Sequence, residues 1–154
     1  MDTVDRKILT ILQENARTPL KVIAEQVFLS SPAVSARIER LEKAGLITGY
    51  QAQLSAAEMG YQIKAFIALE VGPRQKPEFY PYIRSCPNVV ECDCVTGDYS
   101  MMLKVCFRTT QELDQFINRL DQFGRTRTQI VFSTPVEYRG VPVQPPEEAG
   151  GERA

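Results

Sequence analysis

The side chains best suited to chemistry in this sequence lie in one short stretch, SPAVSARIERLEK, from Ser31 to Lys43. On a helical wheel of about 100° per residue with Val34 facing a core, Arg40 and Lys43 point outward, and Arg37 lies on the flank. Arginine bonds guanine through two hydrogen bonds or pairs with phosphate, and small residues near the start of the helix permit a close approach to a groove floor. This pattern predicts contact with nucleic acid.

A second interpretation is open at this point, because the same polar face suits a helix that packs a core and is merely solvated outside. The net charge of the chain is -1, and basic residues outnumber acidic ones by only one as far as Tyr50. Charge alone therefore does not decide between the two interpretations. The elements around the stretch have to decide.

Three amphipathic helices are predicted in the first third of the chain. Asp2 suits the N-cap of the first, and Asp5 complements its positive end. The second is expected to begin with Thr18 as the cap before a proline, and the third repeats this pattern at Ser31. The short connection between the second and third helices matches a helix-turn-helix, whose second member lies in the major groove.

A β-prone stretch, GLITGYQAQL, follows the third helix. Gly45 suits a helix stop, and the residues after it are typical of a strand, so we interpret the stretch as the wing of a winged helix. Thr48 and Tyr50 would reach the sugar-phosphate backbone from there. The predicted DNA-contacting residues are Lys21, Ser31, Pro32, Ala33, Ser35, Ala36, Arg37, Arg40, Lys43, Thr48 and Tyr50.

Within this set, Ser35, Ala36 and Arg40 are expected at base edges, and Lys21, Arg37 and Lys43 at phosphates. Replacing Arg40 by alanine should then lower affinity for an operator without changing the oligomer.

The composition favours neither an enzyme nor a membrane or exported protein. The chain has no histidine, no glycine-rich phosphate loop, and no Ser/Lys or Cys/His pair at catalytic spacing. No apolar run approaches the roughly 18 residues needed to cross a bilayer, and the first residues lack the basic start of an export signal. We therefore expect a cytoplasmic protein that is not an enzyme and has no cofactor.

The cysteines allow two interpretations. Cys92 and Cys94 lie two apart on one predicted strand and so share a face, and Cys106 on a neighbouring strand is a candidate third member. Such a thiol cluster suits a metal- or redox-responsive regulator. The favoured interpretation is that these cysteines are small apolar residues in a packed sheet, because no histidine completes a mixed site. No metal site is predicted.

The second half of the chain alternates strands and helices from Ile63 onward. The strands are IKAFIALEV, VVECDCVTG, YSMMLKVCF and TQIVFSTPVEY, and the helices are PEFYPYIRS and a segment capped by Thr110. This βαββαβ order is ferredoxin-like. Because both faces of the first strand carry apolar residues, the face that no helix covers is expected to be buried against a second copy, which gives a dimer.

Three stretches resemble the Lrp/AsnC, or feast/famine, family of transcriptional regulators. They are DRKILTILQENART in the first helix, VFLSSPAVSARIERLEKAGLITGYQAQL through the third helix and the stretch after it, and VTGDYSMMLKV in the second half. Their order and spacing cover the chain to about Tyr138. The resemblance implies a regulator that binds double-stranded DNA, forms dimers that often assemble into octamers, and binds a small effector, commonly an amino acid, at a subunit interface.

The family's Gly-Asp-Tyr-Asp motif marks the effector site, and here it reads Gly97, Asp98, Tyr99, Ser100. A carboxylate holds an ammonium group through a charge-assisted bond, and serine does so less strongly, so the change predicts an altered ligand preference or weak amino-acid binding. Gly97 and Asp98 are equally compatible with a plain hairpin turn. The effector-binding residues implied are Thr96, Gly97, Asp98, Tyr99, Ser100 and Thr126.

The predicted fold class is α+β, an N-terminal winged helix-turn-helix domain followed by a C-terminal ferredoxin-like βαββαβ domain. We predict a DNA-binding domain over residues 1–53, a linker over 54–62, and an effector-binding and oligomerisation domain over 63–139. Residues 140–154 are expected to be a disordered tail, because prolines break regular elements there and glutamates keep it solvated.

Overall fold

The computed structural model describes residues 1–143 and shows two compact units. The first comprises Met1–Ala52 together with the stretch that begins at Val136, and the second comprises Gln53–Pro135. Residues 144–154, most of the predicted tail, lie outside the described residues. Within residues 1–143 no helix is long and apolar enough to cross a membrane.

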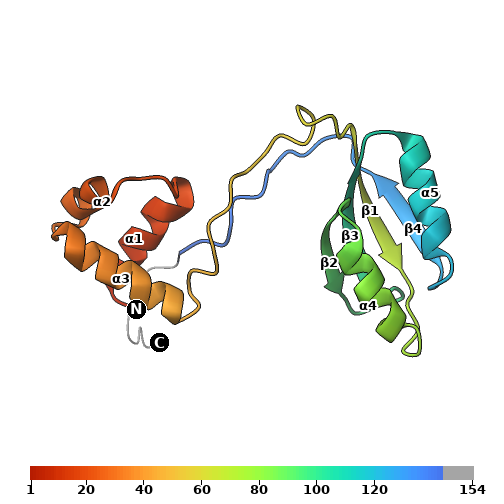
Figure 1. Ribbon diagram of the computed structural model, residues 1–154, viewed down its shortest axis with the longest axis horizontal. Coiled ribbons are helices and arrows are strands. Elements are labelled where there is room, and N and C mark those ends of the chain that lie inside the picture. The colour runs from red at the N-terminus through yellow and green to blue at the C-terminus, as the bar shows by residue number, and fades with distance from the viewer. Residues whose placement is uncertain (144–154) are drawn as a thin grey trace, which may run out of the picture. The chain divides into compact units, whose positions relative to one another are not determined.

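Three helices make up the folded part of the first unit, α1 (Thr3–Glu14), α2 (Leu20–Val27) and α3 (Ser31–Lys43) (Figure 1). They pack because each carries an apolar stripe at helical spacing, as the sequence predicted. The fully buried centre is formed by Ile8 of α1, Ile23 of α2 and Val34 of α3, with Ala24 and Val27 beside them. The predicted helix-turn-helix is confirmed. Because Val34 of α3 is buried against α1 and α2, the opposite side of α3 faces outward.

The predicted start of α1 is confirmed, since Asp2 and Asp5 form a reciprocal capping box. The other caps were each predicted one residue off. Pro19, not Thr18, precedes α2, and the Thr18 hydroxyl donates to the Asn15 carbonyl at 2.7 Å. Ser30 rather than Ser31 caps α3, and Thr109 rather than Thr110 caps the last helix. A proline lacks an N–H, which no residue of the first turn needs, so it suits several positions there and does not fix the cap.

The stretch predicted as a β-prone wing contains no strand. Gly45 ends α3 with φ +71°, as expected of a helix stop, but no strand begins before Ile63 in the described residues. A strand is stabilised by its partner's backbone groups, and residues 46–54 are not paired with one. Thr48 and Tyr50 therefore lie on extended backbone that is open to solvent.

The second unit has the predicted βαββαβ order (Figure 1). Its elements are β1 (Ile63–Leu69), α4 (Lys76–Ser85), β2 (Val89–Cys94), β3 (Met101–Phe107), α5 (Thr110–Leu120) and β4 (Thr126–Ile130). The antiparallel sheet has the strand order β2-β3-β1-β4, which confirms the ferredoxin-like prediction. The last strand starts two residues earlier and ends sooner than predicted, because its ladder with β1 runs from Leu69–Thr126 to Ala65–Ile130.

One face of this sheet packs against α4 and α5 and forms the main core. Ile67 and Leu103 are fully buried on it, under Phe79 of α4 and Phe116 of α5. The opposite face carries alternate residues of the same strands and is mixed in character. Its members, read from the strand register, are Lys64, Phe66 and Ala68 of β1, Glu91 and Asp93 of β2, Met102, Lys104 and Cys106 of β3, and Arg127 and Gln129 of β4. The sequence predicted an apolar face, but the apolar surface is limited to a strip around Phe66, which is 38% exposed.

Candidate nucleic-acid interface and effector turn

The outward side of α3 carries small residues near its start and basic residues further on. Pro32, Ala36, Arg40 and Lys43 are all exposed, whereas Val34 and Leu41 on the opposite side are buried. Arg37, Ser31 and Ala33 are half-buried. The buried stripe fixes this orientation, so the helix presents to solvent the residues that the sequence pattern selected.

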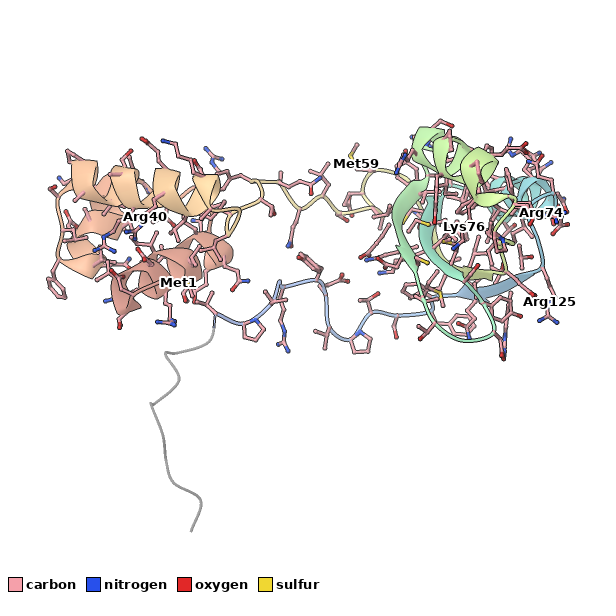
Figure 2. All side chains as sticks on the ribbon, turned by 90° about the horizontal axis from the view of Figure 1, so that it is seen from below. Met1, Arg40, Met59, Arg74, Lys76 and Arg125 are labelled. Carbon is pink, nitrogen blue, oxygen red and sulfur yellow. The ribbon has the colours of Figure 1, made fainter. Side chains whose placement is uncertain are left out.

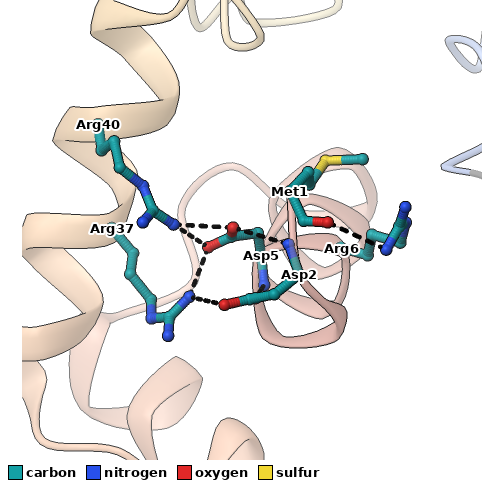
Figure 3. Close-up of polar contacts among 6 residues, drawn as sticks. All are labelled: Met1, Asp2, Asp5, Arg6, Arg37 and Arg40. Carbon is teal, nitrogen blue, oxygen red and sulfur yellow. Dashed lines mark hydrogen bonds and ion pairs between the residues drawn. The ribbon is translucent and has the colours of Figure 1, made fainter. Parts of the chain in front are cut away.

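Two arginines of α3 are held by acids at the start of α1 (Figure 3). Arg37 Nη1 donates to Asp2 Oδ2 at 2.6 Å and to Asp5 Oδ1 at 2.7 Å. Arg40 Nη2 donates to both oxygens of Asp5, at 2.7 and 2.8 Å. The Asp5 carboxylate is 2% exposed, whereas the Asp2 side chain is 51% exposed. Asp5 is therefore a buried anchor for α3, and Asp2 is an open neighbour of Arg37.

The network changes the ionisation of all three groups that it joins most closely. Burial raises the pKa of Asp5, but hydrogen bonds from the Asp2 N–H and from Arg37 outweigh this and leave that pKa below its ordinary value. The backbone N–H of Asp5, followed by the Arg37 guanidinium, lowers the pKa of Asp2 to about 2. The same two carboxylates raise the pKa of Arg37. Both acids are thus ionised at neutral pH.

The other flank of α3 is acidic. Ser35, Glu39, Glu42 and Tyr50 line one surface hollow, together with residues of α1 and α2. The Tyr50 hydroxyl donates to Glu42 Oε1 at 2.8 Å, and burial together with this carboxylate raises the pKa of Tyr50 to about 12. Ser35, predicted to contact base edges, lies on this hollow. The structure therefore separates the predicted DNA-contacting residues onto a basic and an acidic flank.

The remaining predicted DNA-contacting residues lie away from this network. Lys21 is exposed on α2, and Thr48 is exposed on the extended stretch after α3. Arg40, one of the three residues predicted to contact base edges, has a side chain that is 60% exposed although Asp5 holds one of its nitrogens. Its partner on α1, Asp5, was not predicted from the sequence, because helical periodicity does not show which ends of two helices meet.

The predicted effector turn connects β2 to β3. The Val95 N–H donates to the Ser100 carbonyl at 3.0 Å, and Gly97 has φ +111°, which favours glycine. Thr96, Gly97 and Asp98 are exposed, while Tyr99 and Thr126 are half-buried. The turn therefore combines a hairpin geometry with accessible polar groups.

Ser100, which replaces the family's acid, is hydrogen-bonded to the backbone at the C-terminal end of β1. Its hydroxyl accepts a hydrogen bond from the Val71 N–H at 2.9 Å and donates one to the Val71 carbonyl at 3.1 Å. Its own N–H donates to the Leu69 carbonyl at 3.2 Å. These contacts give Ser100 a structural part that its sequence position did not reveal.

Two charged residues beside the turn were missed by the sequence analysis. The Arg125 guanidinium lies over the Tyr99 ring at 5.5 Å from its centroid, and its Nη2 lies 3.5 Å from Glu70 Oε2. Figure 2 shows the Arg125 side chain at the edge of the second unit, pointing outward. Only the pairing of β4 with β1 brings these residues together, and no local pattern signals that pairing.

The three strand cysteines do not form one cluster. Cys92 is paired with Leu103 and packs on the helix-covered core, whereas Cys106 is paired with Lys64 and lies on the other face of the sheet. Burial raises the pKa of both thiols. Cys94 is exposed, and no group of three potential metal ligands occurs within residues 1–143. The hypothesis that Cys106 lies near the other two cysteines is therefore wrong. Cys106 lies three residues beyond Leu103, the partner of Cys92, on β3, and an odd number of residues along a strand reverses the face.

The fold and these sites define a DNA-binding transcriptional regulator with a ferredoxin-like second domain. Residues 1–48 match the family model described as winged helix-turn-helix DNA-binding, and residues 64–141 match the model of the Lrp/AsnC ligand binding domain. The chain belongs to the Lrp/AsnC family, which confirms the resemblance read from its motifs.

Individual relatives are similar along almost the whole chain. The HTH-type transcriptional regulator FL11 of Pyrococcus furiosus is 31% identical over 147 residues, covering 94% of this chain and 97% of that protein. The solved structure of AsnC from E. coli is 30% identical, with a TM-score of 0.81 over 90% of this chain and 96% of its own. A transcriptional regulator of Neisseria meningitidis in complex with L-Met is 27% identical, with a TM-score of 0.87 over 93% and 97%.

Proposed function

We propose that this regulator reads DNA with the outward and basic side of α3 and responds to a small effector, an amino acid, bound near the β2–β3 turn. In this proposal it acts in the cytoplasm, where chromosomal DNA is reached, and has no catalytic activity. Pro32 and Ala36 approach the groove floor, and Arg40 and Lys43 supply base and phosphate contacts. Arg37, Lys21 and Thr48 flank them at the sugar-phosphate backbone.

The observation that carries this proposal is the asymmetry of α3. Arg40 and Lys43 are exposed on the outer side of the helix, on the same flank as Arg37. Glu39 and Glu42 line the hollow on the other flank. A duplex carries one negative charge per about 1.7 Å of its axis, so it favours the side that carries Arg40 and Lys43 over the flank that carries Glu39 and Glu42. The small residues at the start of that side add the close fit that a groove requires.

The uncovered sheet face supports assembly of at least two copies. Phe66 and Met102 form an apolar strip there, and Lys64 and Lys104 flank it. Association over this strip would bury it and bring together two helix-turn-helix units, which bind two half-sites with the symmetry of the dimer. An octamer would arise from further contacts between dimers.

The effector proposal rests on the charges around Tyr99. An amino acid carries a carboxylate and an ammonium group, and Arg125 and Glu70 offer one partner for each within the same small region. Asp98 at the exposed turn is a second partner for an ammonium group. Ser100 contributes to the shape of the site through its bonds to Val71 and not through charge. The L-Met bound to the Neisseria meningitidis relative supports an amino acid as the ligand class.

DNA binding is tested by fluorescence anisotropy with a duplex from the promoter of the protein's own gene, over a series of salt concentrations. Lys43→Gln should weaken binding and reduce the slope of log K against log salt by about 0.9 per subunit, since one phosphate contact is lost. Lys76→Gln, on α4 of the second unit, is the matched control and should leave both quantities unchanged. Equal behaviour of the two variants would count against α3 as the reading helix.

Effector binding is tested by isothermal titration calorimetry with a panel of amino acids that includes L-Met. Arg125→Gln should reduce affinity for the amino acid that binds, because its carboxylate loses a charged partner. Arg108→Gln removes a guanidinium that also lies over a tyrosine, Tyr61 at 5.2 Å, and serves as the matched control. Binding that is unaffected by Arg125→Gln would place the effector elsewhere.

A further inference from the structure

We propose that Asp2 is a built-in competitor of DNA for Arg37, so that it limits the affinity of the regulator for every duplex. The inference rests on the proposed function, in which Arg37 contacts the sugar-phosphate backbone. It assigns to the start of α1 a part in binding strength that is separate from holding the helices together.

The geometry separates the two acids that hold Arg37. Asp5 is buried, and it also holds Arg40, so its removal would leave the second half of α3 without its anchor. Asp2 is half exposed, and the Arg37 side chain is 27% exposed, so solvent reaches their contact. An ion pair open to water contributes little to stability and exchanges easily with another anion. Asp2 is therefore the partner that a phosphate can replace, while Asp5 keeps its hold.

The charge of Asp2 matters in a second way. It lies beside both arginines of the basic flank (Figure 3). A hollow lined by Met1, Asp2, Asp5 and Arg40 opens next to Asp2. A phosphate that approaches Arg37 from solvent must displace this carboxylate or bind close to it. Like charges at such a separation repel, and the cost falls equally on all sequences, because phosphates carry no sequence information. The effect is thus on affinity and not on specificity.

Asp2→Asn tests this inference with little structural change. Asparagine caps a helix about as well as aspartate, and its amide oxygen can accept the hydrogen bond that the Asp5 N–H now donates to Asp2 Oδ1 at 2.8 Å. Asp2→Ser is a second uncharged variant that also caps α1. Urea unfolding of both variants, compared with the wild type, verifies that the first unit remains folded.

A matched control is available in the same helix. Glu14→Gln changes the net charge by the same amount at the opposite end of α1. The two ends lie about 18 Å apart at about 1.5 Å per residue, which is roughly two Debye lengths at 0.1 M salt. Loss of a distant charge should therefore act weakly, whereas loss of the charge that contacts Arg37 should act directly.

Anisotropy titrations are made with the promoter duplex and with a duplex of the same length and scrambled sequence. Asp2→Asn should tighten binding to both by about two- to fivefold, the range expected for an exposed ion pair. It should also steepen the salt slope by up to about 0.9 per subunit if Arg37 gains a phosphate. In an Arg37→Gln background the same Asp2 substitution should lose most of its effect, because the residue for which Asp2 competes is gone and only the repulsion between Asp2 and nearby phosphates remains.

The outcomes separate this inference from the proposed function. If Asp2→Asn behaves like Glu14→Gln, weakens binding, or tightens it equally with and without Arg37, the inference is overturned while DNA binding stands. If the wild type binds neither duplex in a salt-dependent way, the proposed function and the inference both fail. A gain with Asp2→Asn that Asp2→Ser reproduces and that the Arg37→Gln background largely removes supports both.

Discussion

Replacing Asp5 by asparagine should destabilise the first unit by about 2–3 kcal/mol. The substitution keeps the shape of the side chain and one oxygen, but it removes the charge that holds Arg37 and Arg40 at 2.7–2.8 Å. A hydrogen bond to a charged group contributes about 1.5–3 kcal/mol, and three such bonds from two arginines are weakened here. That sum is reduced because the arginines are 27% and 60% exposed and regain water when released.

The assay is urea unfolding at pH 7, followed by circular dichroism at the helix band. The midpoint should fall while the dependence on urea concentration stays the same, as for a change in stability alone. Glu25→Gln replaces an exposed acid on α2 of the same unit and should change the free energy of unfolding by no more than about 0.5 kcal/mol. A loss below that value for Asp5→Asn would refute the assignment of Asp5 as the anchor of α3.

The pH dependence of this difference provides a second check. The pKa of Asp5 is lower in the folded protein than its ordinary value of 3.8, so its stabilising contribution is fully present above about pH 4. It is lost as the pH falls through the folded pKa, because the protonated carboxyl no longer attracts the arginines. Wild type and Asp5→Asn should therefore differ most at neutral pH and converge in acid. A difference between the two proteins that persists undiminished in strong acid would contradict this cause.

Three further predictions concern the backbone and the thiols. Phe28 has φ +57° and is 89% exposed, so Phe28→Gly should relieve strain and stabilise the first unit by about 0.5–1 kcal/mol in thermal unfolding, whereas Phe28→Ala should not. Gly124→Ala should cost about 3 kcal/mol or more in urea unfolding, because its Cβ would lie 1.7 Å from the Glu70 carbonyl oxygen, whereas Gly97→Ala, with open space around it, should cost only about 1 kcal/mol. Cys94 is exposed, so a disulfide reagent at pH 8 should show a fast phase that Cys94→Ser removes and that zinc does not change; protection of that phase by zinc would revive a metal-binding interpretation.

The sequence by itself determined the elements and their order. Apolar residues at helical spacing in α1 to α3 and alternating residues in β1 and β3 each require one buried face, and this requirement is local enough to read without coordinates. The motif around Gly97 likewise identified the family. Caps were predicted only to within one residue, because serine, threonine and proline each suit several neighbouring positions at a helix start.

Tertiary structure alone decided which of these elements meet and what their side chains do there. The contacts of Asp2 and Asp5 with Arg37 span more than thirty positions, and the approach of Arg125 to Glu70 depends on the pairing of β4 with β1. Strand register likewise put Cys92 and Cys106 on opposite faces of the sheet. A local pattern shows that a face must be covered, but the partner that covers it is selected by packing over the whole unit.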